Sequence, residues 1–478
     1  MSSKADIKEL LFTKFPYEPT TCQFNLIDML ADFILKKEKQ CVFVLKGYAG
    51  TGKTTIVSAL VNTLPLLKLK SVLLAPTGKA AKVLANYSNK QAFTIHKKIY
   101  RITTSKEGTI NFTLQENLFT NTIFIVDEAS MISNESVSSG DSNMFSVRNI
   151  LDDLMQYVFN GDNCKLILIG DTAQLPPVKL AISPALDVNY LNKNYDVSSD
   201  TIELVDVVRQ SQDSGILANA TLLRKVINTK KKQKVKFISP KYKDFIRLNG
   251  ADFEDAIQSA YSKNGIENTV IICRSNKRAN LYNQEIRNRI LLRESEIAAG
   301  DLLMIVRNNY YWLPKESKAG FIANGDTVEI VKIMKYEDLY GFRFAKVIVR
   351  FLDYMNEPDL DVTILLNTLT SETPSLSSED NKRLYEEISK DYEDIPNKRS
   401  RLEKVKNNPF FNALQVKFAY SLTCHKAQGG QWDTVFVEQG YLTGEMINTE
   451  YYRWLYTAIT RALNTLYLVN FNDEFFEK

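Results

Sequence analysis

The sequence has 478 residues, of which 44% are hydrophobic and 24% are charged, and its formal net charge is +4. This length predicts about two to four globular domains, and the charge is too small to indicate a nucleic-acid partner by itself. The sequence has no long apolar run, no apolar signal-peptide core and no C-x-x-C pair, so we expect no membrane span, disulfide framework or metal–thiolate site, and a cytoplasmic location.

Short apolar runs that end in polar or glycine-rich turns recur along the chain, and helical patterns lie between many of them. The runs are rich in Val, Ile and Leu rather than alternating, which is typical of strands buried on both faces of a parallel sheet. One group precedes Val178, and a second group, split by a long insertion, follows it. We therefore predict an α/β fold with two parallel-sheet domains. The predicted strands are 42–45, 71–75, 122–126, 165–169, 269–273, 434–437 and 465–469, and the clearest helices are 79–86 and 277–290.

Three segments depart from this pattern. Residues 100–121 alternate on both sides of Lys106-Glu107-Gly108, which predicts a β-hairpin. The basic run 229–236 is more often a solvated loop than a nucleic-acid contact. Residues 332–411 begin with strand-like alternation and become polar and helical from 377 to 404, which indicates a subdomain inserted into the second α/β domain.

A glycine-rich loop with G-x-x-x-x-G-K-T spacing follows the first predicted strand and precedes a helical pattern. Gly47, Gly50 and Gly52 let the backbone curl so that its N–H groups point toward phosphate oxygens. Lys53 can reach the β- and γ-phosphates, and the Thr54 hydroxyl can bind Mg²⁺. The alternative, a chance glycine-rich turn, does not explain the strand and helix around it, so a nucleoside triphosphate site is predicted.

Polar side chains follow two later strands. Asp127 and Glu128 end the strand 122–126, where Asp127 can hold the Mg²⁺ shell and Glu128 can polarise a water molecule. An Asp-Glu helix cap is the alternative, and the glycine-rich loop favours the catalytic interpretation. Gln174 follows the strand 165–169, and its amide can contact the γ-phosphate; without the other motifs this segment would be an ordinary turn.

Two arginines stand in informative contexts. Arg209 lies in the sequence VVRQ, and Arg461 lies in LYTAITRA. Charge that grows on the γ-phosphoryl oxygens requires cations that arrive when domains close. A single arginine is more often part of a surface salt bridge, but these contexts favour the catalytic role.

The chain contains only two histidines, and each follows a threonine by two residues. These pairs are Thr94 with His96 and Thr423 with His425. On an extended segment, residues at this spacing project to the same side, so each pair can donate to successive backbone phosphates of a nucleic-acid strand. The alternative for each histidine is a satisfied structural residue.

Two further segments suit phosphate or base contacts. Pro76 and Thr77 end the strand 71–75 and precede a helix, whose N-terminus can face another phosphate. Gln23, near the start of the chain, carries an amide that can read the edge of adenine, although a glutamine alone indicates little.

The ordered series GYAGTGKTT, LLAPTGKAA, TIHK, FIVDEASM, IGDTAQLPPV, VVRQS, SLTCHKAQGGQWD and LYTAITRA resembles the motifs of superfamily 1B DNA helicases, in particular the RecD-like and phage Dda-like branch. The resemblance runs from about residue 20 to residue 469. It implies two RecA-like motor domains that move 5′ to 3′ on single-stranded DNA, a β-hairpin pin that splits the duplex, and an SH3-like insert in the second motor.

By position, the resemblance assigns roles to individual residues, with ATP and Mg²⁺ as cofactors. Lys426 and Gln428 are expected to couple the ATP and DNA sites. The expected catalytic residues are Lys53, Asp127, Glu128, Gln174, Arg209 and Arg461. The expected nucleotide contacts are Gln23, Gly47, Gly50, Thr51, Gly52, Lys53, Thr54, Thr55 and Gly429, with Thr54 and Asp127 at the metal. The expected DNA contacts are Pro76, Thr77, Thr94, His96, Asn276, Thr423 and His425.

The expected domains are a first motor at 1–210, a second motor at 211–331 and 412–478, and the insert at 332–411. The expected activity is ATP-dependent unwinding in replication, recombination or repair, by a monomer that acts on single-stranded and forked DNA and has possible single-strand-binding or replisome partners. One alternative is a nucleotide-gated DNA-binding switch, which the intact Glu128, Arg209 and Arg461 disfavour. Another is a small-molecule P-loop kinase, which would lack the second arginine-bearing α/β domain.

Overall fold

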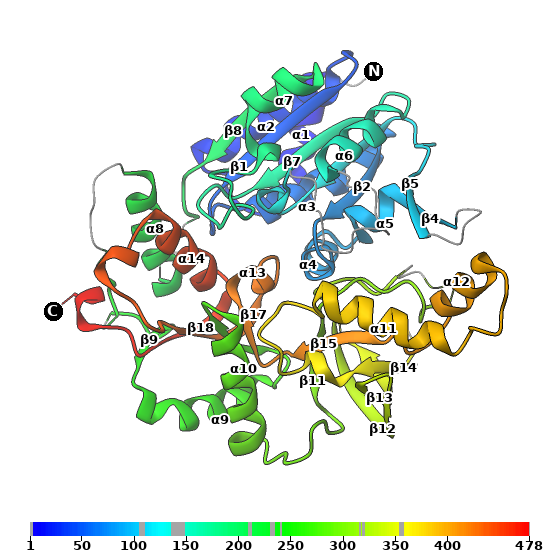
Figure 1. Cartoon of the computed structure of the whole chain (residues 1–478). Helices are drawn as coiled ribbons and strands as arrows, with labels where there is room; N and C mark the ends of the chain where they lie inside the picture. The colour runs from blue at the N-terminus through cyan, green and yellow to red at the C-terminus, as the bar shows by residue number, and fades with distance from the viewer. Residues whose placement is uncertain are drawn as a thin grey trace.

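The computed structural model describes residues 3–104, 110–134, 149–208, 213–229, 235–239, 241–314, 317, 321–352 and 358–477. Within these ranges the chain forms a six-stranded sheet, a five-stranded sheet, a closed barrel and a two-stranded hairpin (Figure 1). None of the helices in the described ranges combines the length and the hydropathy that a membrane crossing requires.

The first α/β domain is built on a parallel sheet with the strand order β3-β2-β6-β7-β1-β8. The four strands predicted in this half are confirmed, while the edge strands β3 and β8 were not predicted, because β3 is short and β8 is largely polar. The strands are β1 (Cys41–Gly47), β2 (Lys70–Ala75), β3 (Ala92–Thr94), β6 (Thr122–Val126), β7 (Lys165–Gly170) and β8 (Ser198–Leu204).

Helices cover both faces of this sheet, which explains the unbroken apolar runs. In β1, Phe43 and Leu45 pack into one core with α2 and α3, while Val42 and Val44 pack into the opposite core with α6. The helices are α1 (Lys4–Lys14), α2 (Thr21–Leu35), α3 (Lys53–Thr63), α4 (Gly78–Ser88), α5 (Ile95–Ile99), α6 (Ile150–Phe159) and α7 (Val188–Tyr195), with 3₁₀ turns at Leu64–Leu67, Ala129–Met131 and Pro184–Leu186.

The second α/β domain has a parallel sheet with the order β16-β10-β17-β18-β9. Its three predicted strands are confirmed as β10, β17 and β18. The strands are β9 (Phe245–Leu248), β10 (Thr269–Cys273), β16 (Ser421–Thr423), β17 (Trp432–Glu438) and β18 (Ala462–Val469). The helices are α8 (Gly215–Asn228), α9 (Phe253–Asn264), α10 (Asn276–Glu285) with a π turn at Ile286–Ile290, α13 (Cys424–Ala427) and α14 (Thr449–Ile459), with 3₁₀ turns at Gly250–Asp252, Gly444–Met446 and Asp473–Phe475.

A closed barrel interrupts the second domain between α10 and β16. Its strands are β11 (Leu302–Ile305), β12 (Thr327–Leu339), β13 (Phe342–Phe351), β14 (Leu360–Leu365) and β15 (Leu414–Phe418). The barrel therefore extends beyond both limits of the predicted insert 332–411, because β11 and β15 pair with each other, with Leu303 opposite Phe418.

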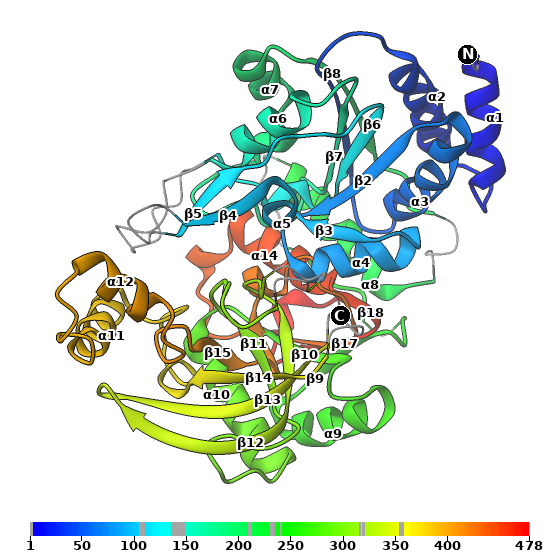
Figure 2. The ribbon, with the colours of Figure 1, turned by 90° about the vertical axis from the view of Figure 1, so that its right-hand side faces the viewer.

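Two helices lie beside the barrel, α11 (Ser378–Lys390) and α12 (Lys398–Lys406), and a 3₁₀ turn (Leu366–Thr368) precedes them (Figure 2). Leu384, Ile388 and Val405 of these helices form a small core with Phe342 and Phe344 of β13. The predicted helical character of residues 377–404 is thereby confirmed.

The hairpin predicted at 100–121 is present in its two strands, β4 (Tyr100–Thr104) and β5 (Ile110–Leu114). They pair antiparallel, with Tyr100 opposite Leu114, and project from the first α/β domain (Figures 1 and 2). The predicted turn residues Lys106-Glu107-Gly108 and most of the basic run, residues 230–234, lie outside the described residues.

Candidate functional site

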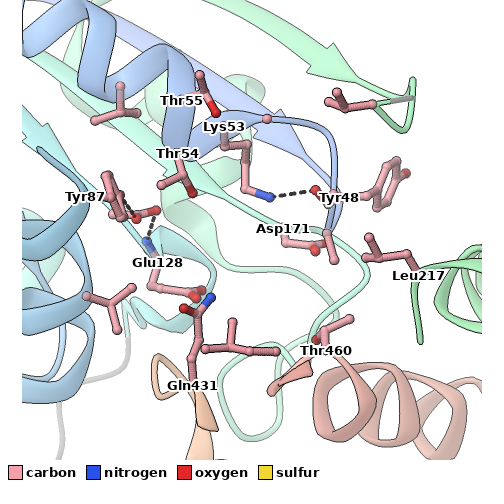
Figure 3. A pocket seen from close by; sticks show the side chains of 18 of the residues that line it. Tyr48, Lys53, Thr54, Thr55, Tyr87, Glu128, Asp171, Leu217, Gln431 and Thr460 are labelled. Atoms are coloured by element: carbon pink, nitrogen blue, oxygen red, sulfur yellow. Dashed lines mark hydrogen bonds between the residues drawn. The ribbon is translucent and has the colours of Figure 1, made fainter. Parts of the chain in front are cut away.

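A cavity of about 440 Å³ lies between the two α/β domains (Figure 3). The first domain contributes the glycine-rich loop and the ends of β6 and β7, and the second contributes the start of α8, Gly429, Gln431 and the segment 460–463. The structure thus brings most of the predicted nucleotide site together. The predicted residues that line the cavity are Gln23, Gly50, Gly52, Lys53, Thr54, Thr55, Asp127, Glu128, Gln174, Gly429 and Arg461.

The loop between β1 and α3 depends on glycine at two positions. Gly50 and Gly52 have φ angles of +75° and +81°, in the left-handed region that disfavours other residues. A Cβ on Gly52 would also lie 2.4 Å from Nε2 of Gln23. Nζ of Lys53 donates to the carbonyl oxygens of Gly47 at 2.6 Å and Tyr48 at 2.8 Å, so this lysine closes the loop on itself.

Gln23 is almost fully buried, and both polar atoms of its amide have partners within the protein. Its Oε1 accepts from the backbone N–H of Thr20 at 3.0 Å, and its Nε2 donates to the carbonyl oxygen of Thr51 at 3.0 Å. Thr51 is also buried and does not line the cavity; its hydroxyl donates to the carbonyl of Tyr48. Gln23 therefore anchors the glycine-rich loop to α2, a contact that the sequence did not reveal, while its contact with adenine stays a prediction.

The two carboxylates after β6 differ in their surroundings. Oδ2 of Asp127 accepts from the hydroxyl of Tyr87 at 2.5 Å, and Oδ1 accepts from the backbone N–H of Glu128 at 2.8 Å. Burial, with the neighbouring charge of Glu128, raises the pKa of Asp127. Glu128 has a φ angle of +53°, an uncommon conformation for a non-glycine residue and one that occurs at functional sites. Nothing in the sequence around Tyr87 pointed to its contact with Asp127.

Arg461 lies across the cavity from Glu128. Its side chain is 5% exposed, and Nη1 is 3.7 Å from Oε1 of Glu128. The guanidinium is fixed by its own domain, because Nε donates to the carbonyl of Thr457 at 3.0 Å, Nη1 to that of Gly430 at 3.4 Å, and Nη2 to the hydroxyl of Thr460 at 3.3 Å. A cation of the second domain is thereby held beside the acidic residue predicted to activate water.

Gln174 is 6% exposed, and its Oε1 accepts no hydrogen bond from any described residue. A buried amide oxygen without a partner is costly unless water or a ligand supplies one, and Gln174 lines the cavity. This fits the predicted role of the residue near the γ-phosphate. The second predicted arginine, Arg209, lies outside the described residues.

Gln428 and Gly429 connect the second domain to the first. Nε2 of Gln428 donates to the carbonyl of Leu175 at 2.9 Å, and the N–H of Leu175 donates to the hydroxyl of Thr457 at 2.8 Å. Gly429 has a φ angle of +75°, and a Cβ there would lie 3.1 Å from Oγ1 of Thr77. The segment predicted to couple the two sites is therefore hydrogen-bonded to the Gln174 turn and lies close to a predicted DNA residue.

The predicted DNA contacts of both domains lie where a strand ends and a helix begins. Thr94 and Thr423 are the last residues of β3 and β16, and Thr77 follows β2; the unpredicted Ser275 holds the corresponding place after β10. These residues are the N-caps of α5, α13, α4 and α10. The hydroxyl oxygens of Thr77, Thr94 and Ser275 accept from the following helix at 3.2 Å each, which leaves each O–H able to donate to a phosphate. β2 and β3 form one edge of the first sheet, and β10 and β16 form one edge of the second, so the two sets occupy similar positions in their domains.

The expectation that the Thr-x-His segments are extended is wrong. His96 lies in α5 and His425 in α13, because the preceding threonine ends a strand as the N-cap and the chain turns at once into a helix. Burial lowers the pKa of His96 to about 4, so its imidazole is neutral at pH 7 and can offer a hydrogen bond but no charge. The DNA contacts of both histidines stay predictions.

The remaining predicted DNA residues lie at the same junctions. Asn276 is the first residue of α10, and Ser275, which the sequence did not single out, is its N-cap. Pro76 directly precedes Thr77. Nζ of Lys426 lies 3.3 Å from Oδ1 of Asn324, which joins the start of α13 to the turn before β12 of the barrel.

Comparisons with known proteins place these features in context. Residues 30–238 match a family model described as an AAA domain, and residues 418–469 match that of a UvrD-like helicase C-terminal domain. The chain is 25% identical over 505 residues to the uncharacterized protein R530 of Acanthamoeba polyphaga mimivirus, covering 89% of this chain and 94% of that protein. It is 31% identical over 198 residues to the ATP-dependent RecD2 DNA helicase of Deinococcus radiodurans, covering 41% of this chain but only 23% of that enzyme.

Among solved structures, a Pif1 helicase from Bacteroides in complex with ADP-AlF3 and ssDNA aligns with 97% of this chain and 95% of its own, at 14% identity and a TM-score of 0.46.

Proposed function

Because the chain belongs to the superfamily 1B helicases, in the branch of the RecD-like and Dda-like enzymes, we propose that it is an ATP-driven motor that moves 5′ to 3′ on single-stranded DNA and unwinds duplex DNA. In this proposal the two α/β domains are the motor domains, and the barrel with α11 and α12 is an insertion in the second. The polarity and the unwinding activity come from the family resemblance.

The observation that carries the proposal is the meeting of Glu128 and Arg461 across the cavity, at 3.7 Å. A triphosphate in the glycine-rich loop would receive the backbone N–H groups at the start of α3 and the ammonium of Lys53. Glu128 would orient and deprotonate the attacking water, and Arg461 would stabilise the charge that grows on the γ-phosphoryl oxygens. Because these two groups belong to different domains, hydrolysis would depend on domain closure, as a motor requires.

The residues at the predicted metal site suit Mg²⁺, which prefers oxygen ligands. The Thr54 hydroxyl and the Asp127 carboxylate supply such oxygens, and Asp127 forms none of the ion pairs found among the described residues. Bound there, Mg²⁺ would neutralise phosphate charge during transfer. Tyr87 would hold the carboxylate of Asp127 in place through its hydrogen bond.

Single-stranded DNA is proposed to run over the carboxyl ends of both sheets, along the helix N-caps. Hydroxyls and backbone amides at these caps recognise phosphates and carry no base code, so binding should be indifferent to sequence and should weaken as salt rises. Gly429 lines the cavity and lies close to Thr77, which offers a direct path from the ATP cavity to this surface. The hairpin β4–β5 is proposed to meet the duplex at a fork while the motor pulls one strand past it.

The test is an ATPase assay with and without single-stranded DNA, followed by strand displacement on duplexes that carry a 5′ or a 3′ tail. We expect DNA-stimulated hydrolysis and displacement from the 5′-tailed substrate. Preference for the 3′ tail would contradict the proposed polarity. Nucleotide-dependent DNA binding without displacement on either substrate would favour the alternative of a nucleotide-gated binding switch.

A further inference from the structure

The hydroxyl of Tyr456 connects the two domains through a short chain of hydrogen bonds. Tyr456 lies in α14 of the second domain, and its Oη accepts from the backbone N–H of Ala49 at 2.9 Å. The same hydroxyl donates to Oδ2 of Asp171 at 2.6 Å, and Oδ1 of Asp171 accepts from the N–H of Ala173 at 2.9 Å. One phenol group of the second domain therefore binds two separate segments of the first.

Both side chains in this chain of bonds are sealed from bulk water. Tyr456 and Asp171 are each 1% exposed. In such surroundings a hydrogen bond to a carboxylate is stronger than at the surface, and a buried acceptor that loses its donor incurs a desolvation penalty. When the domains separate, both bonds break together, so the hydroxyl favours the closed arrangement.

The segments that meet at Tyr456 are those on which hydrolysis depends. Ala49 lies in the glycine-rich loop, directly after Tyr48, whose carbonyl holds Lys53. Asp171 begins the turn that presents Gln174 to the cavity. The helix that carries Tyr456 ends at Ile459, two residues before Arg461.

A second contact strengthens this connection. Thr457, the next residue of α14, accepts from the N–H of Leu175 at 2.8 Å and also holds Nε of Arg461 through its carbonyl at 3.0 Å. The turn from Asp171 to Leu175 is thus fixed at both ends by adjacent residues of one helix, and the orphaned amide oxygen of Gln174 lies between these two anchors.

We propose that Tyr456 is a positioning residue for ATP hydrolysis. Its hydroxyl locks the glycine-rich loop and the Gln174 turn to the helix that delivers Arg461, so that loop, turn and arginine reach their reacting positions in one step of domain closure. The inference rests on the proposed ATPase function and deepens it. Tyr456 itself touches neither phosphate nor water in this scheme.

The test is Tyr456→Phe, which removes the hydroxyl and keeps the buried ring. The matched control is Tyr261→Phe in α9, because the Tyr261 hydroxyl is buried and has no hydrogen-bond partner among the described residues. We expect the kcat of DNA-stimulated hydrolysis to fall about ten-fold or more in Tyr456→Phe, which corresponds to ~1.4 kcal/mol. Binding of ADP, which depends on the loop itself, should stay within about three-fold of the unmodified chain. The control should match the unmodified chain in both.

A double-mutant cycle with Asp171→Asn separates positioning from general damage. If both residues act through one hydrogen bond, the double variant should lose little more kcat than either single variant. Additive losses, a kcat for Tyr456→Phe within two-fold of the unmodified chain, or an equal loss in Tyr261→Phe would overturn the proposal. If melting curves show that Tyr456→Phe is unfolded, the proposal is tested with Asp171→Asn alone. A kcat of Asp171→Asn equal to that of the unmodified chain would overturn the proposal, and a ten-fold lower kcat would support it.

The outcomes also distinguish this proposal from the helicase proposal. An unmodified chain without DNA-stimulated hydrolysis would contradict the helicase function. The same variants would then be compared in their basal hydrolysis, where the positioning role of Tyr456 makes the same prediction.

Discussion

Replacing Glu128 with glutamine should stop hydrolysis while leaving ATP bound. The amide keeps the shape of the side chain but cannot accept a proton from water, so we expect turnover to fall on the order of 10²-fold or more. The substitution also removes a negative charge beside the triphosphate. ATP affinity should therefore be unchanged or tighter, and single-stranded DNA should still bind.

The structure gives a second effect of the same change, on domain closure. A pair of unit charges at the observed 3.7 Å is worth about 4 kcal/mol at an effective dielectric constant of ~20, before the cost of desolvation. The amide retains a dipole toward Arg461, and the Glu128 side chain is 20% exposed, so we expect a net loss of only ~1–2 kcal/mol for closure without nucleotide.

The assay is steady-state ATPase with saturating single-stranded DNA, combined with equilibrium binding of a fluorescent ATP analogue. The matched control is Glu254→Gln, because Glu254 also pairs with an arginine, Arg289, at 2.5 Å, but at an exposed site on α9, which contributes no residue to the lining of the cavity. A turnover of Glu128→Gln within about three-fold of the unmodified chain would refute the assignment of Glu128 as the residue that activates water. Lost ATP binding would instead indicate that Glu128 supports the loop.

Gly52→Ala should weaken ATP binding about ten-fold or more, because the residue has a φ angle of +81° and its Cβ would lie 2.4 Å from the Gln23 amide. The control Gly341→Ala, at a φ angle of +73° but with open space around it, should leave ATP binding unchanged. Burial holds the pKa of His96 at about 4, so between about pH 6.5 and 4 the unfolded chain takes up a proton that the folded chain does not. The free energy of unfolding should therefore fall as the pH falls, by at most ~3.4 kcal/mol. The midpoint of urea unfolding of His96→Gln should depend less on pH in this window, and an unchanged dependence would contradict the assignment. Deleting residues 105–109 and joining β4 to β5 by a tight turn should keep DNA-stimulated ATPase near normal and abolish unwinding of a 5′-tailed duplex; equal loss of both activities, with an unchanged melting curve, would make the hairpin part of the motor.

The sequence predicted those parts of the site whose functional residues are neighbours along the chain. The loop from Gly47 to Thr54 and the carboxylates after β6 each lie at the end of an apolar strand. Strands that are buried on both faces can be predicted from their unbroken runs of Val, Ile and Leu. Such segments can be predicted without knowing which other segments they contact. For the same reason the two sheets were predicted, apart from their short or polar edge strands.

What the sequence did not predict depends on contacts between distant segments. The limits of the barrel follow from the pairing of β11 with β15, and neither strand is distinctive alone. Tyr87 lies in an ordinary helical pattern, and Tyr456 lies in a motif that was singled out only for Arg461. Only the folded chain places their hydroxyls against Asp127 and Asp171. The Thr-x-His segments were assigned the wrong conformation because a threonine can end a strand and cap a helix at once.

The interrupted second sheet has a consequence for how the chain folds. All strands of the first sheet lie before residue 205, so this half can fold as soon as it is synthesised. The second sheet cannot form so early, because its edge strand β9 pairs with β18. Phe245 can therefore pair with Leu466 only after nearly the whole chain has been synthesised. A long loop between paired strands costs little free energy, since each doubling of the loop length adds only about 0.6 kcal/mol to the cost of closing it. Strand pairs that are distant in the sequence nevertheless form slowly.

We expect the barrel to ease this search. The pairing of β11 with β15 places Leu303 opposite Phe418, on segments that lead to β10 and β16. A barrel that forms first would therefore shorten the effective loop between these two strands. Arg461 directly precedes the last strand of this sheet. In the proposed mechanism we therefore expect a nascent chain that has only its glycine-rich loop to hydrolyse no ATP until the second half has folded.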